Sequence, residues 1–250
     1  MPDRYTKNYP VTTVHKDGTV HYLERTVVKE GTIELLINGT HAASILASPA
    51  CVRELAVGYA ICEGIVDSNE ILDVRVNGME VDLHIKCTGN LNIWHELRSS
   101  GYIGVKCQGN ENINVSSDTV FPAKSIFSGT KFLESGVYRV TKGTHLAALV
   151  SRNGELVAQA VDIGRHNAID KVIGHATLNN IDVSQLYLLS TGRQSAGMVL
   201  KAARAGVPLV VTKSAPFDSG IKAAEKTGMG LIGFVSSNEM TVFANKWRID

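Results

Sequence analysis

The sequence predicts an α/β protein with a mixed sheet, built from a smaller α+β unit followed by a larger α/β unit. From His145 onward, apolar runs typical of buried strands alternate with segments of helical periodicity. Such alternation implies a largely parallel sheet with helices on its faces. Asn153-Gly154 separates the first two runs and is typical of a hairpin turn, which adds antiparallel pairs. We expect the two units to divide into residues 1–120 and 121–250.

The smaller unit carries two strong hairpin signals. Asn38-Gly39 and Asn77-Gly78 each lie between runs of strand-like residues within a region expected to be rich in β structure. Between the hairpins we expect a helix that starts at Ser48-Pro49, with the serine as N-cap and the proline in the first turn. Cys51, Leu55, Tyr59 and Cys62 would then share its apolar face. A glycine-rich mobile loop is expected at residues 99–110.

The larger unit begins with a helix that follows Pro122 and ends near Gly136. Strands are then expected at 145–151, 155–161, 186–190, 207–212, 229–235 and 241–244, with helices at 167–177, 195–205 and 218–227.

The composition excludes several classes of protein. Hydrophobic residues make up 44% of the chain, charged residues 20%, and the net charge is +1, so a basic nucleic-acid binder is not expected. No apolar run approaches the roughly 20 residues that cross a bilayer. The first eight residues lack an apolar signal core, and the four cysteines are scattered, which favours free thiols in a reducing cytoplasm. Without HExxH, CxxC or a deaminase-type zinc motif, no metal site is predicted.

Three polar turns follow strands of the larger unit and form the best candidate site. They are residues 162–167, 190–195 and 212–216. Because parallel strands end at one edge of a sheet, these turns should meet there and form a pocket with Arg193 and Lys213, suited to phosphate or another anion. Alternatively, Asp162 and Asn167 merely cap the helix while Arg165 pairs with Asp170. That alternative leaves Arg165 and His166 side by side unexplained, so we favour a binding site.

Among the thiols, Cys107 is the candidate nucleophile. It is flanked by glycines and follows Lys106, whose charge favours the thiolate. An accidental loop cysteine is an equally good interpretation from the local sequence alone. Cys51 and Cys62 are expected to be buried and inert, and Cys87 to be structural.

Several strings in this chain resemble the formate dehydrogenase accessory family (FdhD/NarQ). The most specific is Asp162-Ile-Gly-Arg-His-Asn-Ala168, and the matches run in order over most of the chain. The others are residues 48–65, 143–149, 201–208, 214–216 and 230–235. The resemblance implies a three-layer α/β/α sandwich similar to cytidine deaminases, in a homodimeric, cytoplasmic protein that works without nucleic acid or membrane.

The resemblance also implies a sulfurtransferase activity. Members of the family take sulfur from a cysteine desulfurase as a cysteine persulfide. They pass it to the molybdenum bis(guanine dinucleotide) cofactor, a bound substrate, before that cofactor enters formate dehydrogenase, and they hold no metal of their own. Cys107 would carry the sulfur. The cofactor would be held by Arg165, His166, Asn167 and Arg193 together with Phe234, Val235, Ser236, Ser237, Asn238 and Glu239.

Two departures from the family pattern bear on this expectation. The family loop usually reads Cys-Gly-Val-Cys-Gly, whereas this chain has Ile103-Gly-Val-Lys-Cys107-Gln-Gly, so a persulfide on Cys107 cannot be discharged by an internal disulfide. Ser237, Asn238 and Glu239 stand where family members often have Gly and Arg. The alternative function is therefore an assembly chaperone that binds the molybdenum cofactor without moving sulfur, and a persulfide on Cys107 would decide between the two.

Overall fold

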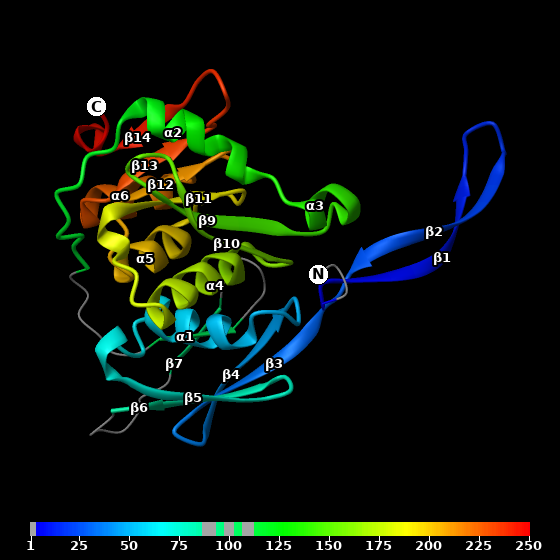
Figure 1. The fold of residues 1–250 in the computed structure, drawn as a ribbon, viewed down its shortest axis with the longest axis horizontal. Coiled ribbons are helices and arrows are strands. Elements are labelled where there is room, and N and C mark those ends of the chain that lie inside the picture. Colours follow the sequence, from blue (N-terminus) through cyan, green and yellow to red (C-terminus); the bar gives the residue numbers. More distant parts are fainter. Residues whose placement is uncertain (1–3, 87–93, 98–102, 107–112) are drawn as a thin grey trace.

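The larger part of the protein is organised around a six-stranded mixed sheet. The computed structural model describes residues 4–86, 94–97, 103–106 and 113–250. The strand order is β10-β9-β11-β12-β13-β14, in which β10 and β14 pair antiparallel to their neighbours and β11, β12 and β13 run parallel (Figure 1). The strands are β9 (His145–Ser151), β10 (Leu156–Asp162), β11 (Leu186–Ser190), β12 (Leu209–Thr212), β13 (Gly230–Gly233) and β14 (Thr241–Ala244).

Helices cover both faces of this sheet. Alternate strand residues point to opposite sides, so Leu149 and Leu188 belong to one apolar cluster and Leu146 and Leu189 to the other. The first side is covered by α4 (Arg165–Leu178), α5 (Ala196–Arg204) and α6 (Asp218–Thr227), the second by α2 (Ala123–Gly129) and η3 (Thr130–Leu133). This three-layer arrangement with a mixed sheet confirms the predicted fold class. The likeness to cytidine deaminases stays a prediction.

The N-terminal half forms a four-stranded sheet with order β4-β3-β6-β5, covered by the helix α1 (Val52–Cys62). Its strands are β3 (Gly31–Ile37), β4 (Thr40–Ala47), β5 (Ile71–Asn77) and β6 (Glu80–Ile85), with η2 (Ser68–Glu70) before β5. Both predicted hairpins are present. Asn38 and Gly39 have positive φ of 49° and 76°, the backbone that a type I′ turn requires.

The predicted start of α1 is wrong. The helix begins at Val52, after Cys51, which is the N-cap in a left-handed conformation with φ of 55°. Ser48 does not cap the helix: its hydroxyl has no hydrogen-bond partner among the described residues, while its N–H donates to Asp162 at 3.0 Å and its carbonyl accepts from Lys171 at 2.9 Å. As a result Cys51 lies outside the helix and is exposed, not buried as expected, whereas Cys62 is buried.

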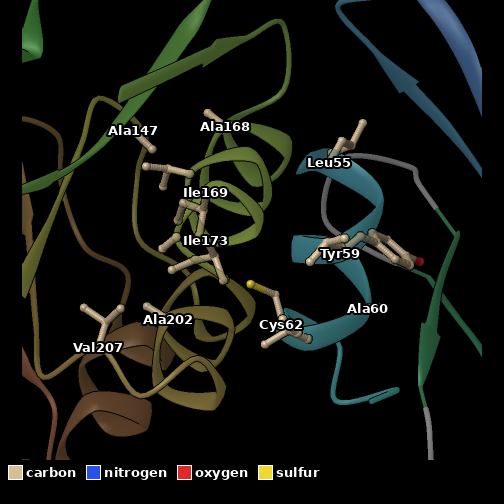
Figure 2. Close-up of a cluster of buried hydrophobic side chains, with 14 of the residues drawn as sticks. Leu55, Tyr59, Ala60, Cys62, Ala147, Ala168, Ile169, Ile173, Ala202 and Val207 are labelled. Carbon is tan, nitrogen blue, oxygen red and sulfur yellow. The ribbon is translucent and has the colours of Figure 1, made fainter. Parts of the chain in front are cut away.

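Helices α1 and α4 pack backbone against backbone. A Cβ atom on Gly58 would lie 1.7 Å from the carbonyl oxygen of Asp170, and one on Gly174 would lie 1.9 Å from that of Glu54. Only glycine permits this approach. The apolar side chains around the crossing, including Ile169 and Ile173, join Cys62 in one cluster, with the sulfur turned toward α4 (Figure 2). The N-terminal sheet, α1 and the main sheet therefore share a continuous core.

A two-stranded ribbon projects from the body of the molecule (Figure 1). It consists of β1 (Thr6–Val14) and β2 (Val20–Val28), which pair antiparallel, and its base lies against α3 (Gly136–Thr141). The strands β7 (Trp94–Leu97) and β8 (Ile103–Lys106) also pair antiparallel. The remaining elements are the short helices η4 (Val183–Gln185) and η5 (Lys246–Arg248).

The proposed boundary at residues 120 and 121 follows an extended segment that already joins the larger half. There the Val115 N–H donates to the Thr227 carbonyl at 2.9 Å, and the Ser117 hydroxyl donates to the Ser184 carbonyl at 2.7 Å. The division into two units stays a prediction. Among the helices in the described residues, none is both long enough and apolar enough to traverse a lipid bilayer.

Candidate anion site at the sheet edge

Strands β10, β11, β12 and β13 point in the same direction, so the turns that follow them meet at one edge of the sheet. Backbone hydrogen bonds link the second and third predicted turns. The Lys213 N–H donates to the Ser190 carbonyl at 3.3 Å, and the Gln194 N–H donates to the Ala215 carbonyl at 3.1 Å. Gly192 brings the first turn against the second, because a Cβ there would lie 2.8 Å from Cβ of Arg165. The three turns are contiguous.

In the first turn, Asp162 ties the two halves of the chain together. Its carboxylate is fully buried, pairs with Lys171 at 2.6 Å, and accepts the backbone N–H groups of Ser48 and Gly164. Asn167 uses its side-chain amide nitrogen in the same network, donating to Asp162 at 3.0 Å and to the Leu46 carbonyl at 2.8 Å. Helix α4 starts after Gly164 without a side-chain cap. The capping interpretation is therefore wrong for Asp162, because its buried carboxylate anchors the turn to Lys171 and to the Ser48 backbone.

This anchoring leaves Arg165 and His166 on the first turn of α4, both partly exposed. The carboxylate of Asp170, suggested as a partner of Arg165, is buried on α4 and accepts two hydrogen bonds from Lys201, at 2.7 and 2.8 Å. Burial, together with the positive charge of Arg193, lowers the pKa of Arg165. Arg193 is therefore close enough to Arg165 for its positive charge to disfavour the protonated form of Arg165.

The second and third turns hold their cations at the surface. The Gly192 carbonyl accepts from Gln194 Nε2 and from the Thr212 hydroxyl, both at 2.8 Å, which fixes the backbone on either side of Arg193. The guanidinium of Arg193 is exposed and lies 5.0 Å from the ring centroid of Phe217, a cation–π contact.

The segment 234–239 closes the far end of this edge. Phe234 has a positive φ of 53° and its N–H donates to the Ser214 carbonyl at 3.2 Å, while the Val235 N–H donates to Thr212. The Ser236 hydroxyl accepts the N–H groups of Asn238 and Glu239 at 3.2 and 3.1 Å. The residues of this segment are exposed, except for the buried Val235. The segment and the third predicted turn are thus neighbours.

A cavity of about 430 Å³ opens at the other end of the edge, beside β9. It is lined by Leu133, Ser135, Tyr138, Lys142, Gly143, Thr144, His145, Leu146, Ile163, Thr191 and Lys213. Sequence reasoning anticipated Lys213 but missed Tyr138, Lys142 and Thr144, because it considered only residues that follow strands. Since β9 runs antiparallel to both its neighbours, the residues that precede it lie at this same edge. The hairpin signal at Asn153-Gly154 could have shown this, because a hairpin places the start of its first strand beside the end of its second.

The electrostatic character of the edge is positive. Burial lowers the pKa of His145, and the charges of Arg165 and Lys213 lower it further against the opposing effect of Asp162. Asp162, the one acid among the groups that shift the pKa of His145, is already paired with Lys171. In the described part of the chain, no group of three or more His, Cys, Asp or Glu side chains is arranged to hold a metal ion. The arrangement suits an anion.

The thiol predicted to carry chemistry, Cys107, lies outside the described residues, as does Cys87. Of the other two, Cys51 has its sulfur 3.6 Å from the Tyr5 hydroxyl. Burial raises the pKa of the Cys62 thiol well above its ordinary value, and the neighbouring Asp170 adds to this effect. Cys62 is therefore buried, as expected, and its raised pKa favours the protonated thiol.

The fold and this edge define an α/β protein with cationic side chains at one edge of its sheet, and comparison with known proteins places it more narrowly. The structure is similar to that of a chain from Desulfotalea psychrophila assigned to the formate dehydrogenase accessory proteins, with a TM-score of 0.83, 21% identity, and coverage of 98% of this chain and 100% of that one. The FdhD/NarQ family model matches residues 28–250. The chain belongs to the FdhD/NarQ family, which confirms the resemblance seen in its sequence.

Relatives in this family carry an informative name. The Sulfur carrier protein FdhD of Methanothermobacter thermautotrophicus is 35% identical over 228 residues, covering 89% of this chain and 91% of that protein. The protein of the same name from Wolinella succinogenes is 30% identical over 260 residues, covering 99% and 91%.

Proposed function

We propose that this chain is a sulfur carrier that serves formate dehydrogenase by delivering sulfur to its molybdenum cofactor. The observation that supports this most directly is the gathering of Arg165, Arg193 and Lys213 at one sheet edge, in a family whose relatives are named sulfur carrier proteins. A bis(guanine dinucleotide) cofactor carries several phosphates, and charge-assisted hydrogen bonds from such cations are among the stronger contacts available to a protein. The cations present therefore fit this substrate.

In the proposed reaction, the thiolate of Cys107 attacks the terminal sulfur of a persulfide on a cysteine desulfurase. The sulfur–sulfur bond of the donor breaks, its cysteine leaves as a thiolate, and Cys107 becomes the persulfide with no net oxidation. Releasing that sulfur as sulfide takes two electrons. A second loop cysteine would supply them by forming a disulfide. Because this chain has a single cysteine in that loop, an external thiol or the acceptor must supply the two electrons.

Cofactor contacts are assigned to two groups of residues. Arg165 and Arg193, beside His166 and Asn167, would hold phosphates, and the exposed segment 234–239 would hold a guanine nucleotide at the far end of the edge. Asn167 would act mainly through the turn that it fixes, because its amide nitrogen already donates to Asp162 and Leu46. The proposal includes a homodimer in the cytoplasm that works without nucleic acid or membrane.

The sulfur-transfer step is tested by intact-protein mass spectrometry after incubation with a cysteine desulfurase and cysteine. The wild type should gain the mass of one sulfur atom, and Cys107→Ser should gain none. Cys51→Ser is the matched control, since it removes an exposed thiol, and it should gain sulfur as the wild type does. If Cys107→Ser still takes up sulfur and supports normal maturation of formate dehydrogenase, Cys107 is not the carrier.

The cation cluster also supports a second function, an assembly chaperone that binds the cofactor without moving sulfur. Binding through the cations alone would not require a reactive thiol. Calorimetric titration with GDP tests the binding part that both functions share. Arg165→Ala and Arg193→Ala should each weaken binding by roughly 1.5–3 kcal/mol, about ten- to a hundredfold. Arg75→Ala, in the N-terminal sheet and paired with Asp73, is the control. Unchanged affinity in both edge variants would place the nucleotide elsewhere, and nucleotide binding without sulfur uptake would favour the chaperone.

A further inference from the structure

The cavity beside β9 has charged groups on two of its walls. Lys142 follows α3 as its C-cap in a left-handed conformation with φ of 56°, and Lys213 follows β12. Their ammonium nitrogens lie 5.2 and 5.4 Å from the centroid of the same ring, that of Tyr138. One aromatic ring thus positions two cations. The backbone of Tyr138 is in turn fixed by its N–H, which donates to the Ser135 hydroxyl at 3.0 Å.

These two positive charges have no acidic partner among the residues that the structure describes. The described residues of the cavity wall include no carboxylate, and among the ion pairs of the described chain none involves Lys142 or Lys213. His145, which also lines the cavity, has its pKa lowered by burial and by the charges of Arg165 and Lys213. Two lysines beside one cavity attract an anion more strongly than either would alone.

Polar groups at the base of the cavity complete a binding surface. Thr144 is 7% exposed, and its hydroxyl has no hydrogen-bond partner among the described residues. Leaving a buried hydroxyl without a partner costs free energy, so a ligand or water that accepts from it is favoured. The neighbouring Thr191 hydroxyl accepts the Leu146 N–H at 2.9 Å and lies 3.4 Å from Nδ1 of His145.

We propose that this cavity is a diphosphate site in which Lys142 and Lys213 neutralise the ligand and Thr144 donates a hydrogen bond to it. A diphosphate carries negative charge on two phosphate groups, so each of the two lysines can bind one. A ligand with a single carboxylate would match this pair of lysines less well. The absence of acids from the described wall disfavours a divalent cation as the ligand. The site does not use Arg165 or Arg193, and it shares Lys213 with the cationic edge of the sheet. It rests on the proposed function only for the source of the diphosphate, a guanine dinucleotide.

The test is calorimetric titration of the full chain with inorganic pyrophosphate. Lys142→Gln and Lys213→Gln should each weaken binding by about ten- to a hundredfold, and Thr144→Val by roughly two- to tenfold. Lys131→Gln is a matched control, because Lys131 also lies over an aromatic ring, 4.9 Å from the Phe132 centroid, but does not line the cavity. The control should bind as the wild type does.

Failure has a clear form. If folded wild-type protein does not bind pyrophosphate at millimolar concentration, or if both lysine variants bind it as tightly as the wild type, the site is refuted. GDP and guanosine then identify the source. A nucleotide diphosphate is indicated if GDP competes with pyrophosphate in a lysine-dependent way and guanosine does not compete, whereas binding of pyrophosphate without competition by GDP indicates a free anion.

These outcomes are separable from the fate of the proposed function. Cys107→Ser should bind pyrophosphate as the wild type does, because sulfur uptake is not part of this site. If lysine-dependent pyrophosphate binding is found in a chain that takes up no sulfur, the diphosphate site stands and sulfur transfer is refuted.

Discussion

Substituting the glycines where α1 crosses α4 should destabilise the whole protein. Real Cβ atoms essentially never approach other heavy atoms closer than 3.0 Å, yet a methyl group on Gly58 would lie 1.7 Å from the Asp170 carbonyl oxygen and one on Gly174 would lie 1.9 Å from that of Glu54. Both obstacles are helix backbone, which cannot rotate aside as a side chain can. Gly58→Ala or Gly174→Ala must therefore push the two helices apart by more than an ångström.

The size of the destabilisation follows from the buried side chains that pack around the crossing of α1 and α4. Leu55, Ile169 and Ile173 are at most 1% exposed, and Tyr59 is 2% exposed. Overpacking a core typically costs 1–3 kcal/mol, and more where nothing can yield. Separation also loosens the side-chain contacts on both sides of the crossing, each of which contributes dispersion energy. We expect each substitution to lower the free energy of unfolding by about 3 kcal/mol or more.

Urea denaturation followed by circular dichroism measures this loss. Gly197→Ala is the control: Gly197 also lies in a helix, but the nearest atom to its added Cβ would be His166 Cε1 at 3.7 Å, an ordinary contact. Alanine is favoured over glycine in helices by about 0.5–1 kcal/mol, so the control should be neutral or stabilising. Equal midpoints for Gly58→Ala and Gly197→Ala would show that the helices do not cross as closely as described.

Three further predictions follow from buried and titrating groups. Asp162→Asn should cost about 3–5 kcal/mol in urea denaturation because it leaves Lys171 buried without its partner; adding Lys171→Met should recover part of that loss, and strict additivity would contradict the pairing. Iodoacetamide should modify Cys51 but not Cys62 in the native protein, as peptide masses would show, because Cys62 is buried with a raised pKa; rapid native labelling of Cys62 would contradict its burial. The folded pKa of His145 lies below its ordinary 6.5, so the unfolded chain binds more protons, and the stability that this group contributes is lost as pH falls below 6.5. In His145→Gln the urea midpoint should therefore depend less on pH over this range than in the wild type, and an equal pH dependence would refute the assignment.

Local signals predicted most of the fold. The strands of the larger half and its helices α4, α5 and α6 were placed to within a few residues, because strand and helix periods differ clearly there, and α6 and β14 were placed without error. The single helix expected between Pro122 and Gly136 is divided into α2 and η3, and α3 was missed. Both hairpins formed where an Asn-Gly dipeptide predicted them, because glycine readily adopts the positive φ that a tight turn needs, as Gly39 and Gly78 do. The start of α1 could not be predicted in this way. Its backbone at Ser48 is bound by Asp162 and Lys171, which are far away in the sequence.

The site was predictable only where it follows parallel strands. Turn composition and the rule of common strand ends located Arg165, Arg193 and Lys213. The residues before β9 were missed, because their position depends on the direction of that strand relative to its neighbours. The structural function of Asp162 was also missed. Nothing near it in the sequence indicates that Lys171 and the Ser48 N–H converge on its carboxylate.

The crossing of α1 and α4 also constrains how the protein is made. A ribosome releases the N-terminal half first, and domains generally fold as units in that order. The buried stretch of α1, from Leu55 to Cys62, packs on a helix that begins only at Arg165. Until α4 emerges, a nascent chain bears an apolar helix with one side open, which invites chaperone binding or aggregation. The same late helix carries Arg165 to the cationic edge and shields α1, so a chain that ends before α4 has neither.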